Sequence, residues 1–120
     1  VLTYGSGFFL FLDAAQELAK EGIEAEVVDL RTLKPLDMET VAASVRKTHR
    51  AVIVHEACLT GGFGAELAAR IQAELFDELD APVLRVAAKD VPIPFSPPLE
   101  EFVLPKPADV VRAVKAVCYR

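Results

Sequence analysis

Short apolar stretches and longer amphipathic stretches alternate along the chain. Four short stretches, rich in β-branched residues and bounded by turn-forming residues, predict strands: residues 1–5, 25–30, 51–55 and 83–88. Four longer stretches repeat apolar side chains every three or four positions and predict amphipathic helices: residues 8–21, 38–48, 63–79 and 107–117. The order of these elements predicts strand–helix units that repeat through the whole chain.

The third predicted strand, Ala-Val-Ile-Val-His at residues 51–55, is almost continuously apolar. A parallel strand covered by helices on both faces has this composition, so we place it at the centre of the sheet. Strands that alternate with helices favour right-handed crossovers and a parallel sheet between two helical layers. The predicted fold is therefore α/β, a three-layer α/β/α arrangement with a mostly parallel sheet, and residues 1–120 form a single domain.

Turn-forming and capping residues indicate where the predicted helices begin and end. Gly22 ends the first helix, Asp37 is a suitable N-cap for the second, and Pro107 suits the first turn of the last. The stretch from Pro92 to Pro105 contains five prolines. It lacks the N–H donors of a strand, yet it is too apolar to be disordered. We expect this stretch to lie extended across the surface.

The first helix has more large apolar residues than one inward face requires. The stripe predicted to face the sheet is formed by Phe8, Phe11, Leu12, Ala15, Leu18 and Ala19. Phe9 and Leu10 fall outside this stripe. Burying a Phe or Leu side chain is worth about 1.5–3 kcal/mol, so the pair predicts that two copies of the chain associate through this helix. The alternative is that the amino-terminal turn folds back and both residues join the core.

Charge and composition exclude several classes of protein. The chain has 13 Lys and Arg against 18 Asp and Glu, a net charge of −5. It therefore lacks the basic surface of a protein that binds nucleic acid or docks on an anionic membrane. Its longest apolar run, residues 8–12, is far shorter than the ~20 residues of a membrane span. Cys58 and Cys118 have no metal-binding or redox spacing and predict reduced thiols of a soluble intracellular protein.

His55 and Cys58 are candidates for a nucleophile and its base at the carboxyl end of a strand. However, the sequence has no Gly-x-Ser-x-Gly motif and matches no nucleophile elbow. The favoured interpretation is that His55 and Glu56 end the strand with hydrogen bonds to a neighbouring loop or subunit.

Gly61, Gly62 and Gly64 precede a helix whose amino end could bind a phosphate, but their spacing is that of neither a dinucleotide-binding loop nor a P-loop. We therefore assign these glycines to backbone geometry and to close packing of the helix on a strand. An acidic cluster at residues 77–80 lies near a helix end, where a solvated face explains it better than a metal site. The residues alone thus describe an α/β domain without a convincing active site.

Three motifs occur in order along the chain. The first is Asp-Leu-Arg-Thr-Leu-Lys-Pro-Leu-Asp at residues 29–37. The second is Val-His-Glu-Ala at residues 54–57, followed by Leu-Thr-Gly-Gly-Phe-Gly-Ala-Glu at residues 59–66. The third spans residues 90–105, which begin Asp-Val-Pro-Ile-Pro-Phe and end Leu-Pro. Together they resemble the carboxyl-terminal domain of the beta subunit of thiamine diphosphate-dependent 2-oxo acid dehydrogenases of the pyruvate and branched-chain type.

This resemblance implies a transketolase C-terminal domain-like fold, in which the strand at residues 1–5 lies beside the strand at residues 51–55. In the family, thiamine diphosphate and magnesium are held by the alpha subunit and by the amino-terminal domain of the beta subunit. We therefore expect no catalytic, cofactor-binding or metal-binding residue in this chain, and we expect the chain to be a fragment of a longer beta subunit. The parent enzyme is an oxidoreductase that oxidatively decarboxylates a 2-oxo acid and transfers the acyl group to lipoamide.

The resemblance also implies partners and a location. The expected partners are the alpha and beta subunits of the parent heterotetramer and the lipoyl acyltransferase core, in the bacterial cytoplasm or the mitochondrial matrix. The interface candidates are Phe9, Leu10, His55 and Glu56. Family members alternate apolar with polar residues where this chain has Phe9 and Leu10, so this pair is either buried against a partner or an alteration of an excised domain. The alternative function is a stand-alone or engineered self-associating module, and the 2-oxo acid that the parent uses is left open.

Overall fold

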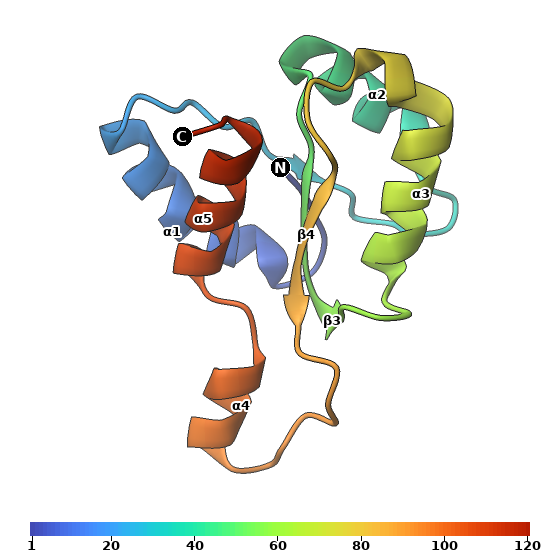
Figure 1. Ribbon diagram of the computed structural model, residues 1–120. Helices are drawn as coiled ribbons and strands as arrows, with labels where there is room; N and C mark the ends of the chain where they lie inside the picture. Colours follow the sequence, from blue (N-terminus) through green and yellow to red (C-terminus); the bar gives the residue numbers. More distant parts are fainter.

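Four parallel strands form the central sheet, and helices cover both of its faces (Figure 1). The computed structural model describes residues 1–120. The strands are β1 (Leu2–Thr3), β2 (Val28–Asp29), β3 (Val52–Cys58) and β4 (Leu84–Ala88). They lie in the order β2-β1-β3-β4, and each neighbouring pair is parallel. Leu2 of β1 is paired with Ile53 of β3, which confirms that the first strand lies beside the third.

The helices form one layer on each face of the sheet. They are α1 (Gly7–Lys20), α2 (Met38–Thr48), α3 (Phe63–Leu75), α4 (Pro97–Val103) and α5 (Pro107–Val117), and the 3-10 turn η1 (Phe76–Glu78) directly follows α3. Helices α1 and α5 cover one face, while α2 and α3 cover the other (Figure 1). The predicted three-layer α/β/α fold is confirmed. None of these helices combines the length and the apolar character that crossing a membrane requires.

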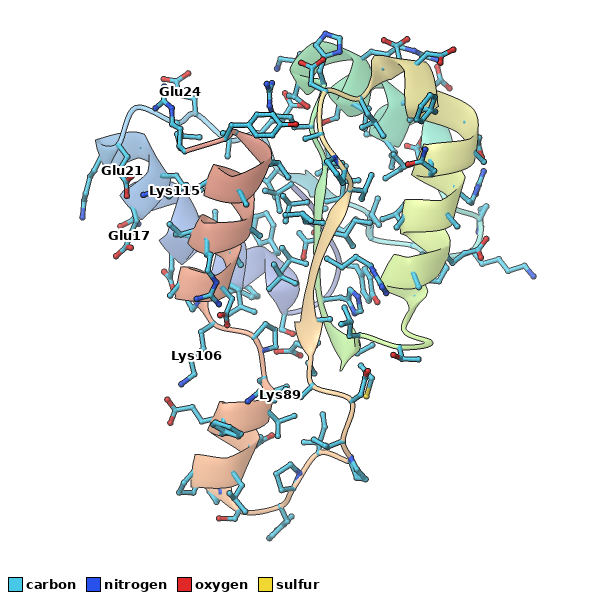
Figure 2. All side chains as sticks on the ribbon, viewed as in Figure 1. Glu17, Glu21, Glu24, Lys89, Lys106 and Lys115 are labelled. Carbon is cyan, nitrogen blue, oxygen red and sulfur yellow. The ribbon has the colours of Figure 1, made fainter.

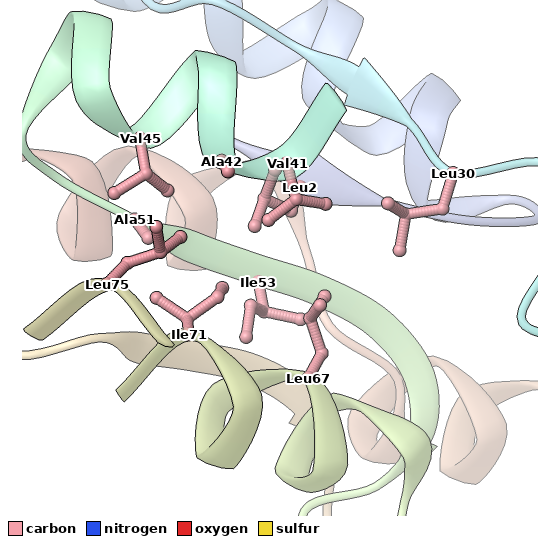
Figure 3. Packing of buried hydrophobic residues seen from close by; sticks show 10 residues of the cluster. All are labelled: Leu2, Leu30, Val41, Ala42, Val45, Ala51, Ile53, Leu67, Ile71 and Leu75. Atoms are coloured by element: carbon pink, nitrogen blue, oxygen red, sulfur yellow. The ribbon is translucent and has the colours of Figure 1, made fainter. Parts of the chain in front are cut away.

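Strand β3 separates two hydrophobic cores, because its side chains alternate between the two faces of the sheet. On one face, Ile53 packs with Val41 of α2 and Leu67 of α3 (Figure 3). On the other face, Val54 packs in a second cluster with Phe11 of α1 and Val110 of α5. Both cores need apolar residues from β3, which explains its almost continuously apolar sequence.

Helices α1 and α5 come from opposite ends of the chain and pack side by side. Their buried faces share the second core, and the Lys115 ammonium lies 2.6 Å from the Glu21 carboxylate on the outside (Figure 2). An exposed ion pair of this kind contributes at most about 1 kcal/mol. Apolar packing therefore accounts for most of the attraction between the two helices.

Helix α2 begins at the predicted N-cap. The Asp37 carboxylate accepts hydrogen bonds from the Thr40 N–H at 3.0 Å and from the Thr40 hydroxyl at 2.6 Å, which satisfies one free donor of the first turn. These bonds, the one from the hydroxyl first, hold the pKa of Asp37 below its ordinary value. At the other end, His49 adopts the left-handed conformation with φ 56° and closes the helix.

The inward face of α1 differs from the predicted stripe. Its buried residues are Gly7, Phe11, Ala14 and Leu18. Leu12, which we predicted to face the sheet, is 43% exposed, and Ala19 is also exposed. The reason lies at Gly7, where a Cβ would lie 3.0 Å from the Val54 carbonyl oxygen. Because the helix backbone approaches β3 at Gly7, the residues that follow it at helical spacing face the sheet.

Several predicted elements are shorter in the structure. The strand predicted at residues 25–30 is reduced to Val28–Asp29, and the first strand ends at Thr3 because Gly5, with φ +61°, turns the chain. The helix predicted at residues 63–79 ends at Leu75, which leaves the helical backbone angles with φ −134°.

The proline-rich stretch forms a short helix, so the prediction of an extended segment across the surface is wrong. Helix α4 begins after Ser96, with Pro97 and Pro98 in its first turn, where a missing N–H costs no helical hydrogen bond. Figure 1 shows α4 well apart from the sheet and its covering helices. We call residues 91–104, which project in this way, the arm.

Candidate functional site at the carboxyl edge of the sheet

The predicted site residues lie toward the carboxyl edge of the sheet, where open α/β sheets place their ligands. His55 and Glu56 belong to β3, while Gly61 and Gly62 form the turn into α3 and Gly64 lies in the first turn of that helix. Phe9 and Leu10 lie in the first turn of α1, which follows β1. The arm leaves the same edge after β4 (Figure 1).

The side chain of His55 is fully buried against helix α3. Its ring stacks on that of Tyr4, with centroids 5.7 Å apart and planes inclined by 11°. Neither Nδ1 nor Nε2 has a hydrogen-bond partner in the chain, and an unpaired buried polar group costs about 1–3 kcal/mol. Burial, and to a smaller extent the positive charge of Arg85, holds the pKa of His55 below its ordinary value. At about pH 7 and above the ring is therefore neutral, and apolar contacts hold it in place.

The prediction that His55 ends the strand with hydrogen bonds to a neighbouring loop is wrong. Strand β3 continues through His55 and Glu56 to Cys58, and the imidazole nitrogens are unpaired. The ring is positioned by stacking and by the helix above it, because the sheet and α3 leave no polar group within its reach. A contact of His55 or Glu56 with another subunit stays a prediction.

Gly62 and Gly64 allow α3 to approach the His55 ring. A Cβ on Gly64 would overlap Nε2 of His55, and a Cβ on Gly62 would overlap the Cys58 carbonyl oxygen and lie 2.9 Å from Cε1 of His55. Gly62 has φ −68° and is needed for space, whereas Gly61 has φ +77°, a conformation that favours glycine. The assignment of these glycines to close packing and backbone geometry is confirmed.

Cys58 and His55 do not form a nucleophile–base pair. The Cys58 thiol faces the Val91 carbonyl oxygen, with Sγ at 4.0 Å. His55 instead faces Tyr4 and the glycines of α3. The geometry therefore gives no support to acyl or other nucleophilic chemistry at this strand.

Surface ion pairs engage the acidic cluster that follows α3. Glu78 lies 3.5 Å from Arg46, and Asp80 lies 3.6 Å from Arg50. No group of three or more His, Cys, Asp or Glu side chains is arranged to hold a metal ion. These contacts agree with a charged surface that faces solvent.

Hydrogen bonds connect the root of the arm to the turn before α3. The Asp90 carboxylate accepts from the Thr60 N–H at 2.8 Å and from the Thr60 hydroxyl at 2.7 Å. These bonds, the one from the backbone first, hold the pKa of Asp90 below its ordinary value. The Lys89 N–H donates to the Val103 carbonyl at 3.2 Å, and the Lys89 ammonium lies 3.2 Å from the centre of the Phe102 ring. The arm therefore leaves the body in a fixed direction.

The arm exposes five large apolar side chains, which sequence reasoning missed. They belong to Val91, Ile93, Phe95, Leu99 and Phe102. Large exposed apolar patches mark protein–protein, membrane or ligand interaction sites, so the arm is a candidate interaction surface. The signal in the sequence was the mixture of large apolar residues with proline, which we interpreted as a segment lying on the surface.

Phe9 is exposed on α1, as its place outside the stripe predicts, with 69% of its surface accessible. Leu10 is partly buried. The alternative in which both residues join the core is wrong for Phe9. The exposed Phe9 ring packs edge-to-face on Phe8, with centroids 5.8 Å apart, so an apolar surface is also present at the start of α1.

The comparisons with known proteins agree with the parallel α/β/α fold of this chain and identify its family. The model of the family described as "Transketolase, C-terminal domain" matches residues 1–110. The chain belongs to this family. A solved structure described as "Split gene transketolase, inactive beta4 tetramer" matches with a TM-score of 0.82 and 34% identity, over 98% of this chain and 37% of that one.

Proteins with similar sequences include beta subunits of the pyruvate dehydrogenase E1 component. The protein of Rhizobium meliloti (strain 1021) is 47% identical over 120 residues, which are 100% of this chain and 26% of that protein. The protein of Rickettsia felis is 49% identical over 119 residues, or 99% of this chain and 36% of that protein. The mitochondrial beta-2 subunit of Oryza sativa subsp. japonica is 50% identical over 109 residues, which are 91% of this chain and 29% of that protein. The chain thus spans between about a quarter and a third of the length of these relatives.

A methyl group added at Gly64 should destabilise the fold through its contact with His55. We expect Gly64→Ala to lower the free energy of unfolding by about 1–3 kcal/mol, the usual cost of overpacking a core, as measured by urea denaturation. In a chain that already has His55→Ala, the same substitution should cost much less, because the overlapping ring is absent. Equal costs in the two backgrounds would contradict this packing.

The buried neutral His55 should make the fold less stable in acid. Its pKa in the folded chain is lower than the ordinary value of 6.5, so the unfolded chain binds the proton more readily and stability falls as the pH decreases below about 6.5. His55→Phe keeps an aromatic ring and removes the titration, so its urea midpoint should change less between about pH 7.5 and pH 5.5.

The matched control for this pH dependence is His49→Gln. His49 is exposed, and its Nδ1 lies 2.9 Å from the Glu78 carbonyl oxygen. This variant removes the other histidine and leaves His55 in place, so the pH dependence that His55 causes should remain. If His55→Phe and His49→Gln show the same pH dependence, His55 is not the group responsible.

Proposed function

We propose that the chain is a non-catalytic assembly domain of the beta subunit of a 2-oxo acid dehydrogenase, and that residues 1–120 are one domain of a longer subunit. The observation that carries this proposal is the arm, which exposes five large apolar side chains and is fixed at its root. A rigid apolar projection gains most from burial against another folded surface, because little freedom is lost on contact. The names of the pyruvate dehydrogenase relatives support this assignment.

In this proposal the parent enzyme oxidatively decarboxylates a 2-oxo acid, with pyruvate favoured by the names of the relatives, and transfers the acyl group to lipoamide. The domain holds alpha and beta subunits together and docks on the lipoyl acyltransferase core. The compartment is the bacterial cytoplasm or the mitochondrial matrix, in keeping with the bacterial and mitochondrial sources of the relatives.

The residues of this chain do not fit thiamine diphosphate and magnesium. A magnesium ion needs several oxygen ligands directed at one point, and no such group of side chains is present. The glycine turn before α3 is the segment most like a phosphate-binding loop, but Gly62 and Gly64 are pressed against His55 and Cys58. We therefore assign both groups to other parts of the parent enzyme and give this domain no catalytic step.

Isothermal titration calorimetry tests this assignment directly. The chain alone should give no binding heat with thiamine diphosphate and magnesium at micromolar concentrations. A full-length relative assembled with its alpha subunit is the positive control under the same conditions. Saturable micromolar binding to the 120-residue chain would overturn the assignment.

A second candidate function is association between copies of this domain through α1. The exposed Phe9 ring supports it, as does the solved transketolase structure, which is described as a tetramer of beta chains. In this case the partner of the α1 surface is a second copy, whereas the arm contacts other parts of the enzyme.

Variants of the two surfaces in the full-length beta subunit distinguish these functions. Phe95→Gln with Leu99→Gln should weaken assembly with the alpha subunit by at least about a hundredfold, because two apolar side chains lose their burial. Native mass spectrometry measures the assembled fraction. Phe76→Gln, at an exposed phenylalanine outside the arm, is the control and should assemble normally.

The double variant Phe9→Glu with Leu10→Lys tests the α1 surface. It is measured in the full-length subunit by the same assay and in the 120-residue chain by sedimentation. A folded monomer in place of a dimer supports the second candidate. Normal assembly of the Phe95 and Leu99 variant would contradict the role of the arm, and an unchanged dimer of the Phe9 and Leu10 variant would contradict the role of α1. Circular dichroism establishes that each variant is folded.

A further inference from the structure

The outer side of β4 is a free edge of the sheet. Leu84 donates its N–H to the Ala51 carbonyl at 3.2 Å, and Ala88 accepts a hydrogen bond from the Leu59 N–H at 3.1 Å. The main-chain N–H and C=O groups of Leu84 and Ala88 therefore point toward β3 and the residues that follow it. Residues of a strand alternate in the side to which their main chain turns. Arg85 and Ala87 therefore present two N–H and two C=O groups outward. The strand at the opposite edge, β2, has only two residues and therefore presents fewer main-chain groups for pairing.

A groove of about 550 Å³ runs along this edge, between β4 and α5. Figure 1 shows β4 in front, with α5 on one side of it and α3 on the other, and no element in front of it. Small side chains line much of the groove: Ala87, Ala88, Ala113 and Ala116. They leave room for another main chain at the strand spacing of about 4.8 Å.

The acidic groups of the groove are already paired within the chain. Asp90 accepts two hydrogen bonds from Thr60. Asp109 accepts from the Lys106 N–H at 2.9 Å and forms an ion pair with Arg112. The ion pair with Arg112 offsets the charge of Asp109. The neutral Thr60 leaves the negative charge of Asp90 in place, and that charge is attracted to Arg85.

Two cations of the groove have no carboxylate at ion-pair distance. Arg85 donates to the Leu59 carbonyl at 2.6 Å, and Lys89 lies over the Phe102 ring. Neither partner neutralises the positive charge, although Asp90 offsets part of the charge of Arg85. With three cations against two carboxylates, the groove has an excess of one positive charge. A segment that adds to this edge is therefore favoured when it has carboxylates beside Arg85 and Lys89.

A second copy of the chain suits this edge less well. Two β4 strands paired antiparallel about a two-fold axis at Val86 would place the two Arg85 side chains diagonally opposite. Long side chains reach each other at this distance, so the two positive charges would repel. A pairing shifted toward the carboxyl end of β4 would need the Lys89 N–H. That group is not available, because it already donates to the Val103 carbonyl. The structure thus favours a different chain as the occupant.

We propose that the β4 edge and its groove bind an extended acidic peptide segment of a partner protein as a fifth strand of the sheet. Its main chain pairs with Arg85 and Ala87, and its carboxylates lie beside Arg85 and Lys89. This mode, in which main-chain hydrogen bonds supply affinity and side chains supply selectivity, is a general way of recognising peptides. The inference is independent of the function proposed for the arm.

A titration of the isotope-labelled chain with a short capped peptide of alternating valine and glutamate tests the inference. We expect saturable NMR shifts of the Arg85 and Ala87 amides and slower hydrogen exchange at both. A peptide with lysine in place of glutamate should bind at least about fivefold more weakly, because it loses the ion pairs with both Arg85 and Lys89 and places like charges beside them. A glutamate peptide N-methylated at alternate residues on its pairing side should not bind.

Variants of the chain complete the test. Ala87→Pro removes an outward N–H that bonds to no neighbour strand, a position where an edge strand tolerates proline, and should abolish binding. Arg85→Gln should weaken binding about fivefold. The control is Arg46→Gln on α2, where Arg46 forms an ion pair with Glu78, and it should leave binding unchanged.

Four outcomes would overturn the inference. They are shifts that map elsewhere, binding of the N-methylated peptide, equal affinity for the lysine peptide, and a dimer of the chain alone that Ala87→Pro dissociates. The last result would identify a second copy as the occupant. If Ala87→Pro does not fold, the N-methylated peptide still decides whether main-chain pairing is required.

Discussion

The contact between α3 and the His55 ring is the constraint on which the carboxyl edge depends. The ring fills the space that Gly62 and Gly64 leave, so α3 begins directly above β3. This fixes the preceding turn, and Thr60 in that turn holds Asp90 at the root of the arm. A buried ring with two unpaired nitrogens thereby sets the direction of an apolar surface that it does not touch.

Local sequence pattern was sufficient where one residue or one period decides the structure. Asp37 capped α2 as predicted, and the apolar run of β3 indicated a strand covered on both faces. The stripe of α1 was wrong at Leu12 because its rotation is decided at Gly7, whose backbone approaches β3. A periodic pattern defines the width of an apolar face, but a tertiary contact defines which of two adjacent residues lies at its margin.

The site was harder to predict because its parts come from distant segments. The surroundings of His55 include Tyr4, Gly64 and Arg85, and no local pattern shows that these meet at one ring. In the same way, the bond between Thr60 and Asp90 joins two turns that periodicity leaves unconnected. The order of the first and third strands came from the resemblance to a family, and the register of Leu2 with Ile53 confirms it.

The layer formed by α1 and α5 has a consequence for synthesis of the chain on the ribosome. The buried residues of the core that contains α2 and α3 lie between residues 2 and 75, so all of them have been translated before the carboxyl-terminal helix is made. The apolar face of α1 is completed by Val110, Val114 and Val117, which are translated long after Phe11. Contacts so distant in sequence form late and slowly. During translation the apolar face of α1 therefore stays uncovered until α5 has been made. We expect a nascent-chain chaperone to bind this face.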